Sequence, residues 1–435
     1  MKGFCVSDTT FERHVERNFR WNFSVNLLDI SFIMLGLSLV SRETVLPLLV
    51  SKLTTSTVAI GLVPAIYSLG MYLPQLLGAS FAEGMPRKKP FVSLVGGVGE
   101  RLPYLLAGVA VLLLAESAPL AALVALVLMF GLSGASAGFA TPAWFDMIAK
   151  VIPLRRRGLF TGLGHGLGAL MGVAGAVVIA FVLDRWAFPQ NFALLFVLAF
   201  GAMVISWLGL VLNREPANPS VRPTVPLASY LRRLPGVLRA DRNFARYIGA
   251  MMVVRGGTMA GSFFLVYGVQ RFQLGGTEVG LLTGVLIGCQ AIFNPLWGVL
   301  GDRRGHKLVL VGGALALALA ALTVWFAPTW PWLVAAFVLL SAFLAADSAS
   351  MLNIILEFCA DEDRPTYIGL SNTLMAPATA LAPLLGGWLA LQLGYPPMFG
   401  LAALLAGLGA ALLIALVHEP RHGRHVHETL PSAAS

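Results

Sequence analysis

Three charged side chains, Asp29, Arg255 and Asp347, interrupt stretches of sequence that are otherwise almost entirely apolar. Ionisable groups within apolar helices are costly to bury, so they usually face one another, a water-filled cavity or a transported ion. A carboxylate in such a place could take up and release a proton, whereas an arginine keeps its charge and could hold an anionic group. These residue types therefore suggest ion or solute binding.

The first two of these charges occupy matched positions in the chain. Asp29 shares one helical face with Asn22 and Asn26. The motif Arg-Asn-Phe occurs at 17–19 and again at 242–244, and this register puts Arg255 one residue from the equivalent of Asp29. Opposite charges at matched depth predict a pair across a central cavity or a divided substrate site. A static ion pair between helices, or a side chain that extends to the membrane surface, is the alternative.

Asp347 differs because no basic residue stands near it in the sequence. Ser350 and Asn353 follow on roughly the same helical side. A lone carboxylate in the middle of an apolar span predicts a proton-coupling site, and a carboxylate satisfied by nearby hydroxyls is the alternative. The adjacent pair Arg42 and Glu43 is predicted to line an outer vestibule from the outer half of the first span, before a proline kink.

Other polar residues within the apolar stretches are more simply explained by hydrogen bonds between helices. Gln290 and Asn294 could contact a solute, but amides in membrane helices more often form hydrogen bonds between helices. Glu100 and Arg101 are neighbours that point about 100° apart on a helix, so each needs its own partner. We expect them to belong to a structural network.

The run GVLGDRRGHK, residues 298 to 307, is the most charged short segment between two long apolar stretches. Its glycines indicate a tight turn, and its charges indicate a position outside the apolar part of the membrane. The residues that define the segment are Gly298, Asp302, Arg303, Gly305, His306 and Lys307.

The elements that must position these residues are long apolar helices. The chain of 435 residues is 57% hydrophobic and 12% charged, with a mean hydropathy of +0.80, whereas soluble domains carry about 25% charged residues. A bilayer-crossing helix needs roughly 20 mostly apolar residues, and strand-like alternation is absent. The sequence predicts twelve spans, at 22–50, 57–84, 90–115, 119–150, 158–183, 189–212, 244–271, 277–300, 308–327, 330–358, 366–393 and 396–418.

The 30 lysines and arginines are distributed very unevenly between the two sides of these spans. With the N-terminus inside, 24 of them fall in inner segments, three in outer segments and three within spans. The positive-inside rule then places both termini in the cytoplasm. The net charge of +9 follows from this topology, so it does not indicate a nucleic-acid partner.

Weak internal repeats divide the chain into two halves of six spans. Beside the Arg-Asn-Phe repeat, RRRGLFTGLGH matches DEDRPTYIGLSN, and PQLLGASFAEGMPRKK occupies the place of NPLWGVLGDRRGHK. Such symmetry is typical of transporters. The predicted organisation is an N-terminal segment 1–21, a bundle 22–212, a central cytoplasmic loop 213–243 with an amphipathic helix, a bundle 244–418 and a cytoplasmic tail 419–435.

Two six-helix halves, a central loop and the pattern G-x-x-x-D-R-x-G-x-K resemble the major facilitator superfamily of secondary transporters. Gly298, Asp302, Arg303, Gly305 and Lys307 match the family signature, and His306 replaces its first basic residue. The resemblance implies an all-α membrane protein of two pseudo-symmetric six-helix bundles. The antiporter motif of span 5 and the basic residue of span 4 found in drug–proton antiporters are absent, which lowers the expectation of drug efflux without excluding it.

The resemblance also implies a role for the charged turn. Asp302 would meet the start of span 5 near Gly158, and the basic residues would reach Glu357 at the inner end of span 10. A carboxylate at a helix N-terminus contributes about 0.3–1 kcal/mol, which suits a gate contact that forms and breaks. A solvated turn that merely follows the positive-inside rule is the alternative.

The sequence contains no recognisable catalytic constellation, nucleotide-binding loop or metal cluster, so we expect neither an enzyme nor an ATP-driven pump. The predicted function is secondary active transport of a small solute by alternating access, with a proton or another ion as the coupling species and no other cofactor. The expected setting is the bilayer of a bacterial inner membrane, with the protein acting as a monomer. An uncoupled facilitator or nutrient importer, and a transport-inactive receptor or scaffold, are the alternatives.

Overall fold

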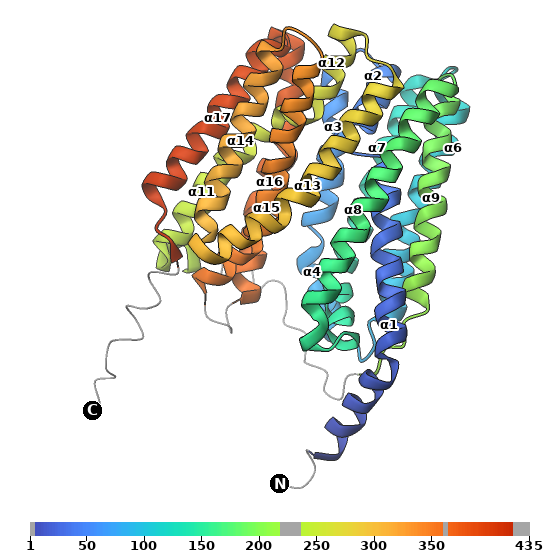
Figure 1. The fold of residues 1–435 in the computed structure, drawn as a ribbon, viewed down its shortest axis with the longest axis vertical. Helices are drawn as coiled ribbons and strands as arrows, with labels where there is room; N and C mark the ends of the chain where they lie inside the picture. The colour runs from blue at the N-terminus through green and yellow to red at the C-terminus, as the bar shows by residue number, and fades with distance from the viewer. Residues whose placement is uncertain (1–4, 218–235, 360–363, 421–435) are drawn as a thin grey trace. The chain divides into compact units, whose positions relative to one another are not determined.

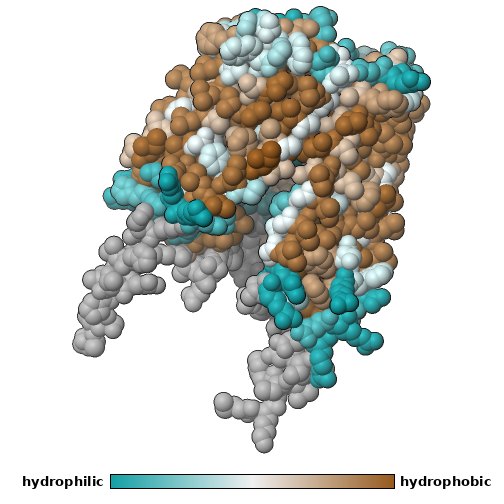
Figure 2. All heavy atoms as spheres, in the orientation of Figure 1, coloured by the Kyte–Doolittle hydropathy of each residue, from teal (hydrophilic) through white to brown (hydrophobic). Residues whose placement is uncertain are grey.

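The computed structural model describes residues 5–217, 236–359 and 364–420, and its regular elements within these ranges are all helical. Twelve helical segments in this part of the chain are long and apolar enough to cross a membrane. Figure 2 shows apolar side chains over the middle of the helices, with hydrophilic residues towards their ends. Together with the helix lengths, this pattern confirms the predicted all-α, multi-pass membrane fold.

The chain forms two compact units, drawn in Figure 1. The first comprises Met1–Leu227 and Gln273–Gly288. Its helices are α1 (Cys5–Leu39), α2 (Val45–Leu53), α3 (Thr57–Tyr72), α4 (Gln75–Glu83), α5 (Lys89–Phe91), the π-helix η1 (Val92–Gly99), α6 (Glu100–Leu114), α7 (Pro119–Val151), α8 (Leu154–Arg185) and α9 (Gln190–Val211).

The second unit comprises Ala228–Phe272 and Cys289–Ser435. Its helices are α11 (Arg242–Gly257), the 3-10 segment η2 (Thr258–Phe263), α12 (Phe264–Phe272), α14 (His306–Phe326), α15 (Pro331–Phe358), α16 (Arg364–Leu393) and α17 (Tyr395–Leu416). Helix α13 (Gly276–Arg304) contributes its first part to the first unit and its remainder to the second. In the first unit, the Gly276 amide donates to Asp184 Oδ1 at 2.7 Å.

The predicted spans agree with the helices to within a few residues, except at the first. The first candidate membrane span is Arg13–Leu39, whereas the sequence predicted 22–50. The chain leaves the helix after Leu39 and resumes at Val45, so that Pro47 falls in the first turn of α2, where a missing N–H is tolerated. The amphipathic helix predicted within 213–243, and most of the predicted tail, lie outside the described residues.

Arg42 and Glu43 consequently do not lie in the outer half of a span, as the sequence predicted. They occupy the break between α1 and α2. The Arg42 guanidinium lies 4.5 Å from the centre of the Tyr67 ring, and Ser41 Oγ donates to Glu43 Oε2 at 3.3 Å. The pair belongs to a helix-terminal turn because the proline ahead of it prevents an uninterrupted helix.

Helices α3 and α7 approach each other closely through glycines. A Cβ atom at Gly138 would lie 2.3 Å from the backbone oxygen of Met71, and one at Gly134 would lie 2.5 Å from that of Tyr67. Small residues let membrane helices approach backbone to backbone, where van der Waals contact replaces the hydrophobic driving force available in water. The sequence pattern of Gly131, Gly134 and Gly138 thus reflects packing.

We expect Gly138→Val to destabilise the first unit by about 1–3 kcal/mol, because the added side chain must displace backbone rather than a flexible side chain. Thermal unfolding of the purified protein in detergent measures this. Gly201→Val is the matched control, since no atom beyond its own stretch of helix lies within 4 Å of the Cβ position there. Equal melting temperatures for the two variants would contradict the close packing of α3 on α7.

Candidate functional site

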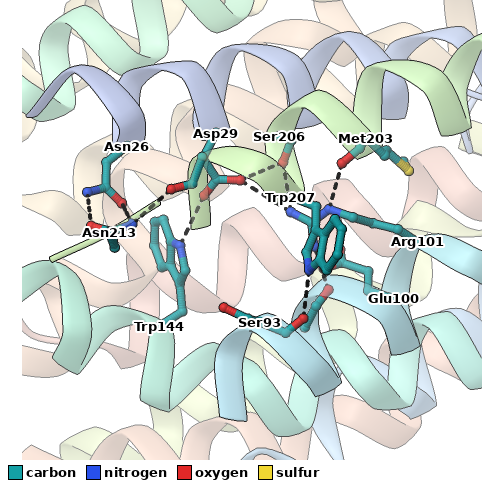
Figure 3. A network of polar contacts seen from close by, with 12 residues as sticks. Asn26, Asp29, Ser93, Glu100, Arg101, Trp144, Met203, Ser206, Trp207 and Asn213 are labelled. Atoms are coloured by element: carbon teal, nitrogen blue, oxygen red, sulfur yellow. Dashed lines mark hydrogen bonds and ion pairs between the residues drawn. The ribbon is translucent and has the colours of Figure 1, made fainter. Parts of the chain in front are cut away.

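Asp29 is the centre of a buried polar network in the first unit (Figure 3). Helix α1 places it where only 3% of its surface is exposed. Its Oδ1 accepts hydrogen bonds from Ser206 Oγ at 2.5 Å and from an Arg101 terminal nitrogen at 3.2 Å. Its Oδ2 accepts one from Trp144 Nε1 at 3.3 Å. Helices α1, α6, α7 and α9 therefore converge on one carboxylate.

Arg101 supplies the positive charge of this network and is itself 5% exposed. Its Nε donates to Met203 O at 3.1 Å, and a terminal nitrogen donates to Ser206 Oγ at 2.8 Å. The other terminal nitrogen donates to Gly96 O and lies 3.5 Å from Glu100 Oε2. Every nitrogen of the guanidinium has an acceptor, so the cost of removing its charge from water is offset by several hydrogen bonds.

The π-helix η1 precedes Arg101 and contributes to its environment. Its wider turn supplies the Gly96 carbonyl that accepts from the guanidinium. Its glycines also permit close contacts, because a Cβ atom at Gly97 would lie 2.2 Å from the Trp207 ring and one at Gly99 would lie 2.7 Å from Ser136 Oγ. Single π-helical turns within helices are frequent at functional sites.

The second unit contains a separate ion pair between Arg255 and Asp347. Arg255 lies in the last turn of α11 and is 6% exposed. One of its terminal nitrogens lies 2.6 Å from Asp347 Oδ1 of α15 and 3.2 Å from Met351 Sδ. The Asp347 side chain is 21% exposed, so this carboxylate is paired but still accessible.

Two sequence-based expectations are corrected by these pairs. Asp29 and Arg255 were predicted to form a pair across the cavity or a divided substrate site. The structure gives each an ion-pair partner from its own unit, Arg101 and Asp347, so the cross-cavity pair is wrong, and the divided substrate site stays a prediction. Asp347 was predicted to be a lone carboxylate, and it is an ion-pair partner. The sequence missed both pairings because the partners stand 72 and 92 residues apart in the chain.

Two features adjoin the pair in the second unit. Tyr247, two turns before Arg255 on α11, is fully buried, and its hydroxyl has no hydrogen-bond partner among the described residues. Directly after Arg255, α11 gives way to the 3-10 segment η2, and Thr258 Oγ1 donates to Arg255 O at 2.7 Å. A 3-10 stretch within a long helix often marks a hinge or local strain.

The charged turn predicted at 298–307 is a helix break of one residue. Helix α13 runs through Asp302 and Arg303 to Arg304, Gly305 has a φ of 94°, and α14 begins at His306. Glycine is required at this left-handed position. A Cβ atom there would also lie 2.3 Å from the Glu419 carboxylate.

The side chains of this turn differ sharply in exposure. Asp302 is 78% exposed, whereas His306 is 2% exposed. His306 Nε2 lies 3.9 Å from Asp302 Oδ1, and its Nδ1 lies 3.1 Å from Ser350 Oγ. Lys307 Nζ donates to Ile414 O at 3.1 Å. His306, the departure from the family signature, is therefore the buried member of the turn.

The remaining predicted residues are more dispersed. Gln290, Asn294 and Gly298 lie along α13, where the two amides are half-buried. Asn353 is exposed, and its amide donates to Ala349 O of its own helix at 2.8 Å. Glu357 lies in the last turn of α15. Their predicted roles in solute contact and gating stay predictions.

A cluster around Glu215 was not predicted. Its carboxylate accepts the backbone N–H of Lys88 at 2.9 Å and of Lys89 at 2.7 Å, and it pairs with Lys150 Nζ at 3.0 Å. Lys88 and Lys150 also lie 3.6 and 3.5 Å from Asp146 Oδ2. A carboxylate at a helix N-terminus is stabilised by the unpaired amides there. The sequence feature that could have indicated this cluster is Glu215 itself, an acidic residue in the segment NREP directly after the sixth span.

Comparisons with known proteins show which sequences and folds this chain is similar to. Residues 247–434 match the family model described as Major Facilitator Superfamily. The D-xylose-proton symporter structure superposes with a TM-score of 0.69, covering 93% of this chain and 99% of that one at 15% identity. A POT family transporter in complex with 5-aminolevulinic acid gives a TM-score of 0.70 over 90% and 95% of the two chains, at 12% identity. The second half of the chain is thus similar in sequence to the Major Facilitator Superfamily, and the chain shares the fold of these solved transporters.

Relatives by sequence carry two kinds of name. A multi-drug resistance efflux pump PmrA homolog of Lactococcus lactis is 29% identical over 181 residues, which cover 40% of this chain and 44% of the relative. The minor myo-inositol transporter IolF of Bacillus subtilis is 30% identical over 143 residues, or 32% of each chain. These matches span less than half of each relative. The names of these relatives are those of transporters, not of enzymes. The described part of the chain contains no group of three or more His, Cys, Asp or Glu residues that could hold a metal ion.

We expect Arg101→Met to destabilise the first unit by about 3–5 kcal/mol, because it leaves the Asp29 carboxylate buried without its positive partner. The double variant Asp29→Asn with Arg101→Met should recover much of this loss, because neither charge then remains. Chemical unfolding in detergent, followed by intrinsic fluorescence, measures both. Additive losses in this double-mutant cycle would contradict the coupling of the two side chains.

Proposed function

We propose that this chain is a secondary active transporter that exports a small organic solute by alternating access, driven by proton uptake at Asp347. The observation that carries the proposal is the Arg255–Asp347 pair. A carboxylate that is 21% exposed within a membrane helix and 2.6 Å from an arginine can change its protonation state. Protonation of Asp347 then removes its attraction to Arg255, which weakens the contact between α11 and α15.

The two buried ion pairs suit different tasks. The Asp29 carboxylate is 3% exposed and has three side-chain donors, so it favours a fixed structural role. The Asp347 carboxylate has one arginine partner and remains accessible, which favours a group that changes state. We therefore assign coupling to Asp347, and solute contact to Arg255 when its partner is neutral.

Export is favoured by the names of the multi-drug relatives, which match 36–40% of the chain at 27–29% identity. The competing assignment is import of a polyol or sugar, which the myo-inositol transporter IolF supports at 30% identity. We place the protein in a bacterial inner membrane as a monomer. The 24 to 3 distribution of basic residues between the predicted inner and outer segments supports a cytoplasmic position for both termini.

Coupling predicts a specific pattern for Asp347→Asn, which removes the titratable group and keeps its size. In proteoliposomes, accumulation driven by a pH gradient should fall at least ten-fold, while solute exchange at equal pH on both sides continues. The assay uses ethidium as a cationic drug and myo-inositol as a polyol. Asp184→Asn is the control, because Asp184 lies at the end of α8 in the other unit. If the protein transports neither probe, the export and import proposals are both wrong as stated. If Asp347→Asn still accumulates a probe in response to a pH gradient, the proposed role of Asp347 is wrong.

The proposed orientation predicts which loops thiol reagents can reach. In a variant whose cysteines are replaced by serine, Glu116→Cys, between α6 and α7, should react with a membrane-impermeant maleimide in intact cells. Arg155→Cys, at the start of α8, should react only after the cells are permeabilised. Both positions are exposed, so a failure to react cannot be attributed to burial of the cysteine. The reverse pattern would place the termini outside.

A further inference from the structure

A row of polar side chains leads from the exposed turn between α13 and α14 towards the Arg255–Asp347 ion pair of the second unit. We propose that His306 relays protons along this row, between water at the turn and the Asp347 carboxylate. The proposal rests on the proposed function, in which Asp347 is the coupling group. It assigns a task to the one residue of the turn that departs from the family signature.

The outer part of the row begins in water and ends inside the protein. The Asp302 side chain is 78% exposed, and its Oδ1 lies 3.9 Å from His306 Nε2. The imidazole is 2% exposed. One nitrogen of the ring therefore faces a solvated carboxylate, while the rest of the ring is enclosed.

The inner part of the row lies on α15. His306 Nδ1 is 3.1 Å from Ser350 Oγ, and Ser350 is fully buried. Asp347 precedes Ser350 by three residues on the same helix, so the two side chains are neighbours on one face, with Cβ atoms about 5–6 Å apart. One water molecule spans such a separation with two hydrogen bonds. The arginine of the ion pair lies beyond, 2.6 Å from Asp347.

The backbone of the turn fixes the ring in this position. A Cβ atom at Gly301 would lie 2.5 Å from His306 Nδ1, so the imidazole packs directly against the last turn of α13. Gly305, with its φ of 94°, places His306 at the first position of α14. Any larger residue at either glycine would displace the ring from Ser350 or the turn from its left-handed conformation.

The charged groups around the ring come from four elements. Asp302 of α13 faces Nε2, and Asp347 of α15 lies behind Ser350. The Glu419 carboxylate, after α17, lies against Gly305. Lys307 of α14 directs its ammonium to Ile414 O, and Glu357 ends α15 two turns beyond Ser350. The Asp302 carboxylate, 3.9 Å from Nε2, stabilises the imidazolium that forms during transfer.

The transfer conserves protons at each step. A proton from water binds His306 Nε2, which gives an imidazolium hydrogen-bonded to Ser350. The Nδ1 proton then moves to Ser350 Oγ as the hydroxyl proton of Ser350 passes through the bridging water to Asp347. His306 returns to its neutral form with its proton on Nε2, and rotation or re-exchange of that proton resets the relay. Imidazole suits this task because it exchanges protons near neutral pH, whereas arginine or lysine at this position would keep its charge.

The test follows protonation of Asp347 itself and needs no transported solute. The purified full chain in lipid nanodiscs is subjected to a pH jump from alkaline to acidic buffer, and the C=O stretch of protonated carboxyl groups is recorded by time-resolved infrared spectroscopy. The band that Asp347→Asn removes is the signal. We expect His306→Gln to slow its appearance at least ten-fold while leaving its final amplitude unchanged. Ser350→Ala should slow it as well.

A chemical rescue separates a relay from a merely structural role. His306→Ala leaves a space the size of the ring. Added imidazole should restore the rate, and pyrazole, which has the same shape but is hardly basic, should not. His418→Gln is the matched control, because His418 lies exposed after α17 in the same unit, and it should behave like the unmodified protein.

Three outcomes would overturn the relay. The first is an unchanged rate of Asp347 protonation in His306→Gln, and the second is equal rescue of His306→Ala by imidazole and pyrazole. If the histidine variants do not give a monodisperse protein, the third is an unchanged rate of Asp347 protonation in Ser350→Ala. If these tests exclude the relay but Asp347→Asn still abolishes transport driven by a pH gradient, the proposed function stands. Normal relay kinetics in a chain that moves no solute would refute the proposed function alone.

Discussion

The cost of placing a charge in an apolar helix governs how this protein is built. An isolated carboxylate or guanidinium in such surroundings costs several kcal/mol, and it is tolerated only with a partner and further hydrogen bonds. In each unit one aspartate and one arginine from different helices meet this requirement, Asp29 with Arg101 and Arg255 with Asp347. Each pair joins elements that hydrophobic contact alone would hold weakly in lipid.

The same requirement produces different results at different depths. The network around Arg101 leaves only 3% of Asp29 and 5% of Arg101 exposed, and its glycines and π-helix permit the close approach that this burial needs. At the ends of the helices, Glu215 satisfies two backbone amides and a buried lysine at once. Between these extremes stands Asp347, which is paired but still exposed. Accessibility, rather than the presence of charge, separates the group suited to change state from the groups suited to hold the fold.

The sequence predicted the fold well and the site only in part, for a physical reason. Span positions depend on local length and hydropathy, so eleven of the predicted spans agree with the helices to within a few residues, and the first fails where Pro47 forces a break. Pairings depend on which helices become neighbours, which no local property records. Arg101 was expected to need a partner, but its partner Asp29 could not be identified, and the burial of His306 required the geometry of Gly301 and Gly305.

The π-helix Val92–Gly99 has a consequence for how this span is compared with others. Each of its turns contains more residues than an α-helical turn, because its hydrogen bonds join residues five apart. Directions of side chains after Gly99 are therefore rotated relative to those of an uninterrupted α-helix. A helical wheel drawn through 89–114 as one helix assigns Arg101 to the wrong face, and a gap-free alignment of this span pairs residues that point in different directions. Lys89–Phe91 and Glu100–Leu114 each keep their own register, and comparisons that respect this will place Arg101 beside Asp29.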